Sequence, residues 1–290
     1  MRYLCLMSIF FSLVVPLLAG EQPESSLKVM TFNIRCISIQ DGKDIWFNRR
    51  KEVAQLIQKY DPDLVGLQEV LHVQLEHLVE DLPGYEWFGL ARDDGKDAGE
   101  RCPVFYKPQV VERMEEGTFW LSETPNVPAS ISWNSACRRV ATWGYFREKK
   151  TGMDFYLMNT HFDHKSEEAR QQSAYLVRGW LTEKAYKIPA VLIGDFNMLD
   201  TSKAYQTLSS YFLDAQKTTK TPAKGPEGTF RPFHVTSVPG KRIDYIFVTD
   251  EVEVLEYAVL DDTYGEENRR PSDHMPVMAA VRLLAIPQIP

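Results

Sequence analysis

Short apolar runs alternate with helical patterns along most of the chain. Ten runs have the length and the β-branched or aromatic content that predict strands: 28–34, 64–67, 86–90, 103–106, 140–146, 155–159, 191–194, 243–248, 252–260 and 277–284. Several of these strands are adjacent in the sequence, which indicates mixed sheets rather than one parallel sheet. Two sheets packed on each other with helices outside, an α/β sandwich, fit this order.

Three segments between these runs carry apolar residues at helical spacing. We expect the first helix to be capped by Asn48 and to end before Pro62, and the second to follow Glu69 with a leucine every three or four residues. We expect Ser166 to cap the third. Segments 93–99, 122–135 and 217–228 are rich in Gly, Pro and polar residues, which predicts surface loops.

The first twenty residues have the pattern of a targeting segment. Arg2 precedes an apolar stretch from Leu4 to Leu18, and small residues follow at positions 19 and 20. We expect residues 1–20 to be a signal peptide, with a retained anchor as the alternative, residues 21–26 a linker and residues 27–290 a single domain. The protein is then expected in the periplasm or outside the cell. Because no second long apolar run exists, we expect no stable membrane attachment of the mature protein.

Composition narrows the possible partners. The net charge of -7 gives no overall attraction to polyanions, so tight non-specific binding of nucleic acid would need a local basic patch or a bound cation. Cys36, Cys102 and Cys137 remain after the signal segment, so at least one thiol is free. A bridge between Cys102 and Cys137 stays open. No cysteine or histidine pair has zinc spacing, which disfavours a structural zinc site.

Polar residues stand directly at the ends of several apolar strands. Strand ends at one edge of a layered α/β fold are where catalytic groups collect. Each has an ordinary alternative, such as a helix cap, an Asx turn or a structural histidine. Together, three or four carboxylates with carboxamides and two histidines suit an oxygen-binding cation such as Mg²⁺. The residues are Asn33, Glu69, His161, Asp195, Asn197, Asp244, Asp273 and His274.

The motifs that contain these residues resemble the endonuclease/exonuclease/phosphatase superfamily. TFN, LQE, NTH, GDFN, IDYIF and SDHMPV occur in that order between residues 31 and 277. The stretches NTHFDH and GTFWLSETP are most similar to an exported bacterial branch. The resemblance implies a four-layer α/β sandwich, with two mixed sheets face to face and helices outside. It also implies hydrolysis of a phosphoester with Mg²⁺, or Mn²⁺ in its place, as cofactor.

The resemblance also implies roles for the individual residues. Glu69 is the expected principal metal ligand, with Asn33 and Asp273 close to the ion. Asp195 and Asn197 would orient or deprotonate the attacking water. His274 would contact the phosphate, His161 would assist the leaving group, and Asp244 would fix one of the two imidazoles.

Three further residues are candidates for substrate binding or support. Glu100 matches a carboxylate that supports the terminal histidine in deoxyribonuclease-like relatives, although Cys102-Pro103-Val104 departs from the usual sequence beside it. Arg139 is a candidate phosphate contact, with a surface or loop-pinning arginine as the alternative. Asp163 lies in the NTHFDH stretch and is a candidate supporting residue.

The sequence therefore predicts a metal-dependent phosphoesterase, expected to be a monomer. Its substrate is either nucleic acid or a small phosphorylated molecule or lipid, such as an inositol phosphate or sphingomyelin. An inactive binding module on the same scaffold is disfavoured because no member of the catalytic set is missing. Glycan hydrolysis by paired carboxylates is a weaker alternative that needs no metal. Tryptophans 46, 120, 133 and 143 lie in or beside predicted loops, where they either stack on a substrate ring or belong to the core.

Overall fold

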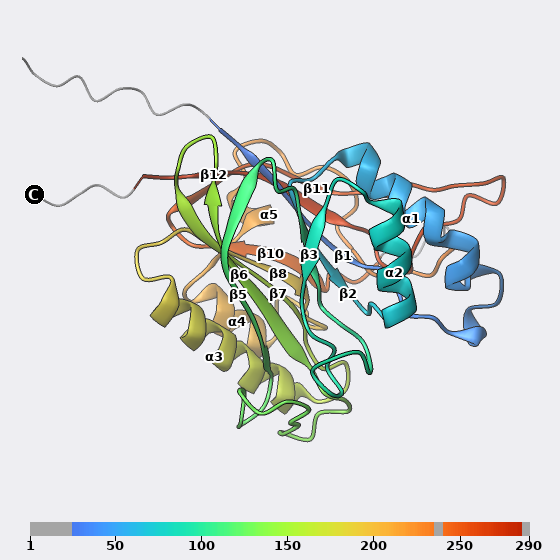
Figure 1. The fold of residues 1–290 in the computed structure, drawn as a ribbon, viewed down its shortest axis with the longest axis horizontal. Coiled ribbons are helices and arrows are strands. Elements are labelled where there is room, and N and C mark those ends of the chain that lie inside the picture. Colours follow the sequence, from blue (N-terminus) through green and yellow to red (C-terminus); the bar gives the residue numbers. More distant parts are fainter. Residues whose placement is uncertain (1–24, 235–239, 286–290) are drawn as a thin grey trace, which may run out of the picture.

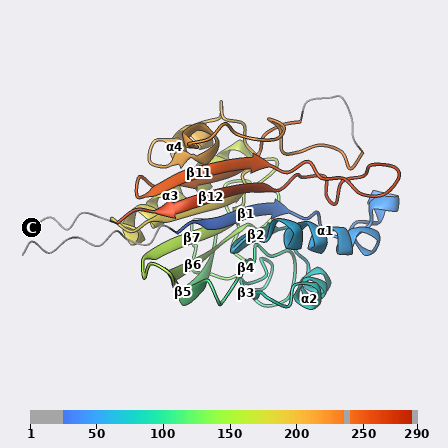
Figure 2. The same ribbon diagram turned by 90° about the horizontal axis from the view of Figure 1, so that it is seen from above.

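Two mixed six-stranded sheets pack face to face, with helices on their outer faces (Figures 1 and 2). The computed structural model describes residues 25–234 and 240–285. The predicted signal peptide and most of the predicted linker lie outside these residues. The predicted four-layer α/β sandwich is confirmed.

The first sheet has the strand order β11-β12-β1-β2-β4-β3. Its strands are β1 (Leu27–Asn33), β2 (Leu64–Gln68), β3 (Glu86–Phe88), β4 (Val104–Tyr106), β11 (Val252–Val259) and β12 (Val277–Leu283). The second sheet has the order β5-β6-β7-β8-β10-β9. Its strands are β5 (Val111–Trp120), β6 (Val140–Glu148), β7 (Asp154–His161), β8 (Ala190–Asp195), β9 (Leu213–Asp214) and β10 (Asp244–Val248).

Helices cover both outer faces of the sandwich. They are the 3₁₀ helix η1 (Ile39–Asp44), α1 (Trp46–Tyr60), α2 (His72–Asp81), α3 (Glu167–Lys184), α4 (Lys203–Ser209) and α5 (Ala215–Thr218). Apolar residues of α1 and α2 form one core with the first sheet, and those of α3 and α4 form another with the second sheet. Among the described residues, none of the helices has the length and apolar content needed to cross a bilayer.

A glycine lets the two sheets approach closely. A Cβ at Gly66 in β2 would lie 2.5 Å from Ile193 Cδ1 and 2.6 Å from Asn159 Cγ, both in the second sheet. Beside it, Gln68 Nε2 donates to Asn159 Oδ1 at 2.7 Å, and Asn159 Nδ2 donates to the carbonyls of Leu67 and Pro103 at 2.9 Å. These buried amides join the two sheets just below the edge where the site lies.

The strand pairing brings the polar strand ends together. β1 and β2 are parallel, as are β7 and β8, so their carboxyl ends meet at the same edge of each sheet. In the second sheet His161 is paired with Asp195, and Asp195 is paired with Asp244 of the antiparallel strand β10. Register alone therefore places one histidine and two carboxylates side by side.

Some local predictions were wrong. Helix α1 begins at Trp46, and its N-cap is Ile45 with no side-chain cap; Asn48 lies in the first turn, where its Nδ2 donates to the carbonyl of Lys43 at 3.0 Å. The ten-residue strand β5 was not predicted, and neither was α4. The start of the predicted loop 217–228 is the end of α5. Ser166 caps α3 as predicted, because its Oγ accepts from Ala169 N at 3.1 Å.

Candidate active site

Asp195, at the end of β8, is the centre of a network of polar side chains. Its Oδ2 accepts a hydrogen bond from Asn33 Nδ2 at 2.9 Å. The same oxygen lies 3.3 Å from His161 Nε2 and 3.7 Å from His274 Nε2. Its Oδ1 accepts from the backbone N–H of Asn197 at 2.9 Å. Burial and the nearby Asp244 carboxylate raise the pKa of Asp195, which makes it a better proton acceptor than an exposed aspartate.

His274 is held between two carboxylates. Its Nδ1 lies 2.9 Å from Asp244 Oδ2, and its Nε2 faces Asp195. Thr229 fixes Asp244 in turn, because its Oγ1 donates to Asp244 Oδ2 at 2.5 Å. Burial alone would lower the pKa of His274, but Asp244 and Asp195 raise it to about 10. His274 is therefore a cation at neutral pH, and Asp244 holds this imidazole rather than that of His161.

Glu69 stands where β2 ends, in a strained backbone conformation. Its φ is 62°, which is rare for a glutamate. Asn33 Nδ2 donates to Glu69 Oε1 at 3.0 Å, and the backbone N–H of Cys36 donates to Oε2 at 3.0 Å. Although burial opposes ionisation, these two bonds with the charges of His274 and Arg35 lower the pKa of Glu69. Glu69 is thus an anion, joined to Asp195 through the amide of Asn33.

His161 and Asn197 form the opposite side of Asp195. Asn197 Nδ2 lies 3.0 Å from His161 Nε2 and donates to the carbonyl of Phe162 at 3.2 Å. Burial, followed by the positive charges of Arg139 and Arg92, lowers the pKa of His161 well below 6.5. His161 is therefore a neutral imidazole at neutral pH. The two histidines differ in charge although both face the same carboxylate.

These side chains open into a pocket of about 400 Å³. The predicted residues that line it are Glu69, Glu100, Arg139, His161, Asp195, Asn197, Asp273 and His274. Asn33 and Asp244 lie behind the wall and contact it through Glu69, Asp195 and His274. The structure therefore brings the eight strand-end residues together in one place.

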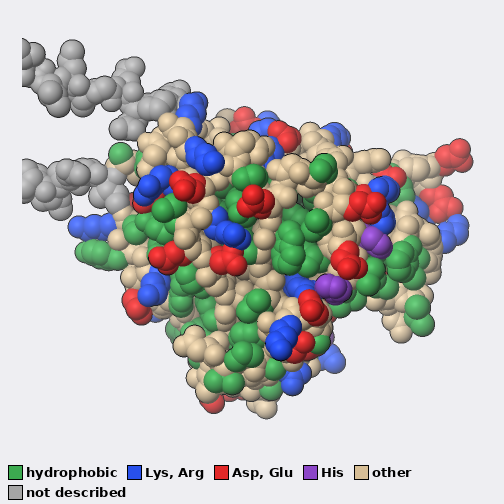
Figure 3. Space-filling model, viewed as in Figure 1, with side chains coloured by type: hydrophobic (Ala, Val, Ile, Leu, Met, Phe, Trp, Pro, Cys, Tyr) green, Lys and Arg blue, Asp and Glu red, His purple; other side chains and the backbone are tan. Residues whose placement is uncertain are grey.

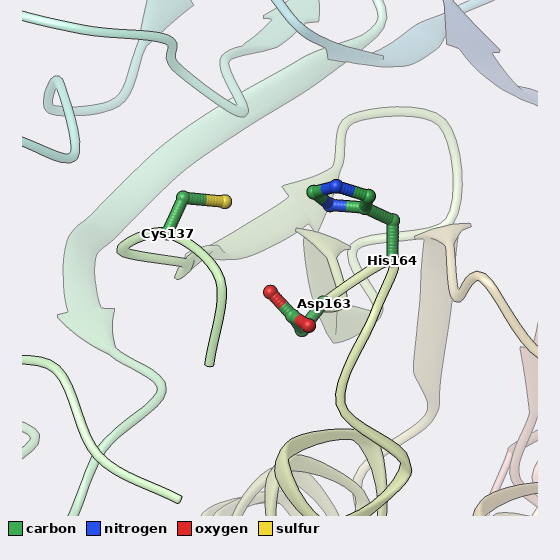
Figure 4. Close-up of side chains that lie close together, drawn as sticks. All are labelled: Cys137, Asp163 and His164. Atoms are coloured by element: carbon green, nitrogen blue, oxygen red, sulfur yellow. The ribbon is translucent and has the colours of Figure 1, made fainter. Parts of the chain in front are cut away.

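The described residues contain two close groups of potential metal ligands. One is Asp195, Asp244 and His274, in which the histidine already bonds to a carboxylate. The other is Cys137, Asp163 and His164, whose side chains converge from the loop before β6 and the segment after β7 (Figure 4). Neither group contains Glu69 or Asp273.

The second group does not suit a transition metal. Both oxygens of Asp163 are occupied: they accept from Ser135 Oγ and from the backbone N–H groups of residues 136, 165 and 166, at 2.6 to 3.0 Å. His164 Nδ1 faces Arg139 Nη2 at 3.1 Å. Burial raises the pKa of Cys137, which disfavours the thiolate that zinc requires. This group organises a loop.

The three candidates for substrate binding or support have distinct positions. Glu100 does not bond to either catalytic histidine; Arg92 binds it through two hydrogen bonds of 2.6 and 2.8 Å, so the expected support of the terminal histidine was wrong. Arg139 is only 5% exposed and lies in the pocket wall, so it is not a surface arginine. Asp163 is a supporting residue, because it fixes the loop of residues 135–137 onto the segment after β7.

Sequence reasoning missed two kinds of residue at this site. Arg92 lines the pocket from the chain after β3, where no motif marks it. Arg49 of α1 is fully buried and donates to the carbonyls of Ile34, Arg35, Asp44 and Pro271 at 2.5 to 3.0 Å. It therefore connects the chain after Asn33 to the chain before Asp273. No signal in the sequence separates Arg49 from other helix arginines.

The structure also shows where the cysteines and the tryptophans of the predicted loops lie. Cys36, Cys102 and Cys137 are all free, so the possible bridge is absent among the described residues. Trp46 and Trp120 are buried core residues, and Trp143 packs against Trp180 with ring centroids 4.8 Å apart. The pocket is not lined by any tryptophan of the described chain.

Comparisons with known proteins agree with this geometry. Residues 30–274 match the model of the Endonuclease/Exonuclease/phosphatase family. A Bacteroides vulgatus endonuclease/exonuclease/phosphatase is 40% identical, with a TM-score of 0.85 over 90% of this chain and 100% of that chain. A Bacteroides thetaiotaomicron mannosyl-6-phosphatase is 38% identical, with a TM-score of 0.85 over 89% of this chain and 100% of that chain.

More distant relatives match in sequence. Rat Nocturnin is 25% identical over 284 residues, which cover 86% of this chain and 63% of that protein. The chain spans just under two thirds of the length of the curated relatives it matches. The family match covers far more than half of the chain and includes Glu69, Asp195 and His274. The chain therefore belongs to the endonuclease/exonuclease/phosphatase family.

Proposed function

We propose that this protein is a Mg²⁺-dependent phosphoesterase that hydrolyses a small phosphorylated molecule with an activated water. The observation that carries the proposal is the position of Asp195 Oδ2, which faces Asn33 and the Nε2 atoms of His161 and His274 within 3.7 Å. A basic carboxylate between a neutral and a cationic imidazole supplies both proton acceptance and charge stabilisation.

The donor set fits a hard divalent cation. Glu69 and Asp273 supply carboxylate oxygens at the pocket, and Asn33 orients Glu69 from behind. A divalent metal is typical of the family, and when bound it would stabilise charge on a non-bridging phosphate oxygen. Glu69 would be the principal ligand, with Asp273 beside it. Mn²⁺ has the same ligand preference and is the expected substitute.

The other residues act on the water and the phosphate. Asp195, oriented by Asn33 and by the backbone of Asn197, would take a proton from the attacking water. His274, kept cationic by Asp244, would donate a hydrogen bond to a phosphate oxygen. His161 and Asn197 would hold the ester oxygen on the other side of Asp195. Positioning and charge stabilisation provide most of the acceleration in such a site.

Two observations favour a small phosphomonoester over nucleic acid. The similarity to a mannosyl-6-phosphatase covers nearly the whole domain at 38% identity, whereas the structural likeness to human Nocturnin is 20% identical and concerns the fold. In addition, positive and negative side chains are interspersed on the face shown in Figure 3, and the net charge is -7. A polyanion track needs a continuous basic surface. We also propose that residues 1–20 direct export of the protein and that the mature protein is a monomer.

The test is a substrate screen with matched variants. Purified protein with Mg²⁺ is assayed on hexose 6-phosphates, p-nitrophenyl phosphate, its bis ester, inositol phosphates, sphingomyelin, plasmid DNA and RNA. We expect hydrolysis of the phosphomonoesters, loss of activity with EDTA and recovery with Mg²⁺ or Mn²⁺. Glu69→Ala and His274→Ala should each lower turnover by orders of magnitude with an unchanged circular dichroism spectrum. Full activity in EDTA, or in either folded variant, would reject the mechanism.

A further inference from the structure

One side of the pocket carries polar and charged groups to which the proposed hydrolysis assigns no direct role. We call Arg92, Glu100, Arg139 and His164 the arginine wall. They come from four separate segments: the chain after β3, the residues before β4, the residues before β6 and the chain after β7. All four line the same pocket as Glu69, Asp195 and His274. A substrate whose phosphate lies against Asp195 can therefore extend toward this wall.

The arginine wall is fixed in place. Arg92 binds both oxygens of Glu100, and Arg139 Nη1 lies 4.0 Å from Glu100 Oε2. Arg139 Nη2 lies 3.1 Å from His164 Nδ1. Asp163, through its four hydrogen bonds, anchors the segment that carries His164. Side chains held in this way keep their geometry before a ligand arrives, which lowers the entropic cost of binding.

Two guanidinium groups of the wall are incompletely bonded. Arg139 is 5% exposed, yet its Nε and Nη1 have no hydrogen-bond partner among the described residues, and neither does Nε of Arg92. Unpaired buried donors are costly, and native proteins keep them mainly where a ligand or water completes the set. Two arginines that line the pocket therefore keep donors without a partner among the described residues, and the carboxylate of Glu100 lies in the same wall.

The carboxylate of Glu100 determines which class of ligand the wall can bind. A hydroxyl both donates and accepts, so adjacent hydroxyls match a wall in which Glu100 only accepts and the guanidiniums only donate. A second phosphate offers acceptors and negative charge, and Glu100 would repel it. Burial, followed by the charge of Arg139, lowers the pKa of His164, so this residue adds no further positive charge at neutral pH.

We propose that the arginine wall is a subsite for the leaving group, that it binds neighbouring hydroxyls of a polyol such as a hexose, and that Glu100 excludes substrates with a second phosphate there. This inference rests on the proposed phosphoesterase function, because it concerns the alcohol released by that reaction. It assigns substrate specificity to Glu100 and Arg139, and it assigns them no part in activating water.

The experiment compares ratios of kcat/KM. Wild type, Glu100→Gln and Arg139→Lys are assayed with Mg²⁺ on mannose 6-phosphate, on p-nitrophenyl phosphate, which lacks hydroxyls, and on fructose 1,6-bisphosphate. Ratios are independent of the fraction of folded protein. Glu100→Gln keeps an acceptor for Arg92, and Arg139→Lys keeps the positive charge, so both test recognition rather than folding. Asp154→Asn, which makes the same acid-to-amide change in a similar two-bond pair with Arg147 on β6 and β7, is the matched control.

We expect Glu100→Gln to lower the ratio of mannose 6-phosphate to p-nitrophenyl phosphate by about tenfold or more, the usual effect of losing a hydrogen bond to a charged group. The same variant should raise the ratio of kcat/KM for fructose 1,6-bisphosphate to kcat/KM for mannose 6-phosphate. Arg139→Lys should lower the first ratio, mainly through KM. Ratios unchanged from wild type in both variants, or changed equally by Asp154→Asn, would overturn the subsite. A wild type that cleaves none of the three would overturn the proposed function and the subsite with it.

Discussion

A single methyl group at Gly194 provides a sharp test of how the fold positions the site. Gly194 precedes Asp195 in β8 and is paired with Thr160 of β7, which precedes His161. A Cβ at Gly194 would lie 2.1 Å from the carbonyl oxygen of Thr160, where contacts below 3.0 Å essentially never occur. Gly194→Ala must therefore separate the two strands by most of an ångström, directly beside the contact between His161 Nε2 and Asp195 Oδ2.

The size of the effect follows from this displacement. A misplacement of about 1 Å in a catalytic group lowers the rate by about 10²-fold. Overpacking should also lower the free energy of unfolding by about 1–3 kcal/mol. For a domain of this size, that corresponds to a decrease in Tm of roughly 2–4 °C for each kcal/mol. The variant is therefore expected to fold, and kcat can be measured on p-nitrophenyl phosphate well below its Tm.

Gly225→Ala is the matched control. Its Cβ would lie 1.9 Å from the carbonyl oxygen of Val259, so the clash is of the same kind, but Gly225 does not line the catalytic pocket. We expect Gly225→Ala to lower Tm and to keep kcat close to that of wild type. The reasoning is refuted if folded Gly194→Ala retains wild-type kcat, or if Gly225→Ala loses as much kcat as Gly194→Ala.

Two further predictions concern the residues behind the pocket wall. Asp244→Asn removes the carboxylate that raises the pKa of His274, so the imidazole should lose its proton at a lower pH than in wild type. We therefore expect kcat/KM to fall about 10²–10³-fold at neutral pH. The alkaline limb of the plot of kcat/KM against pH should move to lower pH. An unchanged alkaline limb would contradict this role of Asp244. Arg49→Met leaves four carbonyls without the donor that they have in wild type. Urea unfolding should therefore show a free energy of unfolding lower by about 4 kcal/mol, on the order of 1 kcal/mol for each carbonyl. A midpoint and slope equal to those of wild type would contradict this prediction.

The strand ends could be predicted because their signal is local. An apolar run followed at once by Glu69, His161 or Asp195 is visible without knowledge of the fold, and parallel pairing then brings such ends to one edge. The order of the runs indicated mixed sheets, and the four-layer arrangement followed from the resemblance to the family. The edge strand β5 could not be predicted because residues 112–116 are exposed and mostly charged, so no apolar alternation marks the strand.

The tertiary contacts of single polar residues could not be predicted from the sequence. Arg49 has the same local pattern as any helix arginine, and only the folded chain places its guanidinium against four carbonyls. Glu100 was assigned a histidine partner because it matches a carboxylate with that role in deoxyribonuclease-like relatives. The structure pairs it with Arg92 instead, since the chain after β3 returns to the same pocket wall. A contact between two distant loops produces no periodic pattern of apolar and polar residues in the sequence of either loop.

The different charges of the two histidines follow from what surrounds them. Carboxylates on both sides keep His274 protonated, whereas burial, followed by the charges of Arg139 and Arg92, lowers the pKa of His161 and keeps it neutral. Asp195 Oδ2 lies between the two rings. Pairs of titratable groups whose environments move their pKa values apart take different roles in acid–base chemistry. Arg139 and Arg92 also contribute to the lowered pKa of His161, after burial. The two guanidinium groups that we propose to contact the leaving group are therefore among the groups that keep the second imidazole uncharged.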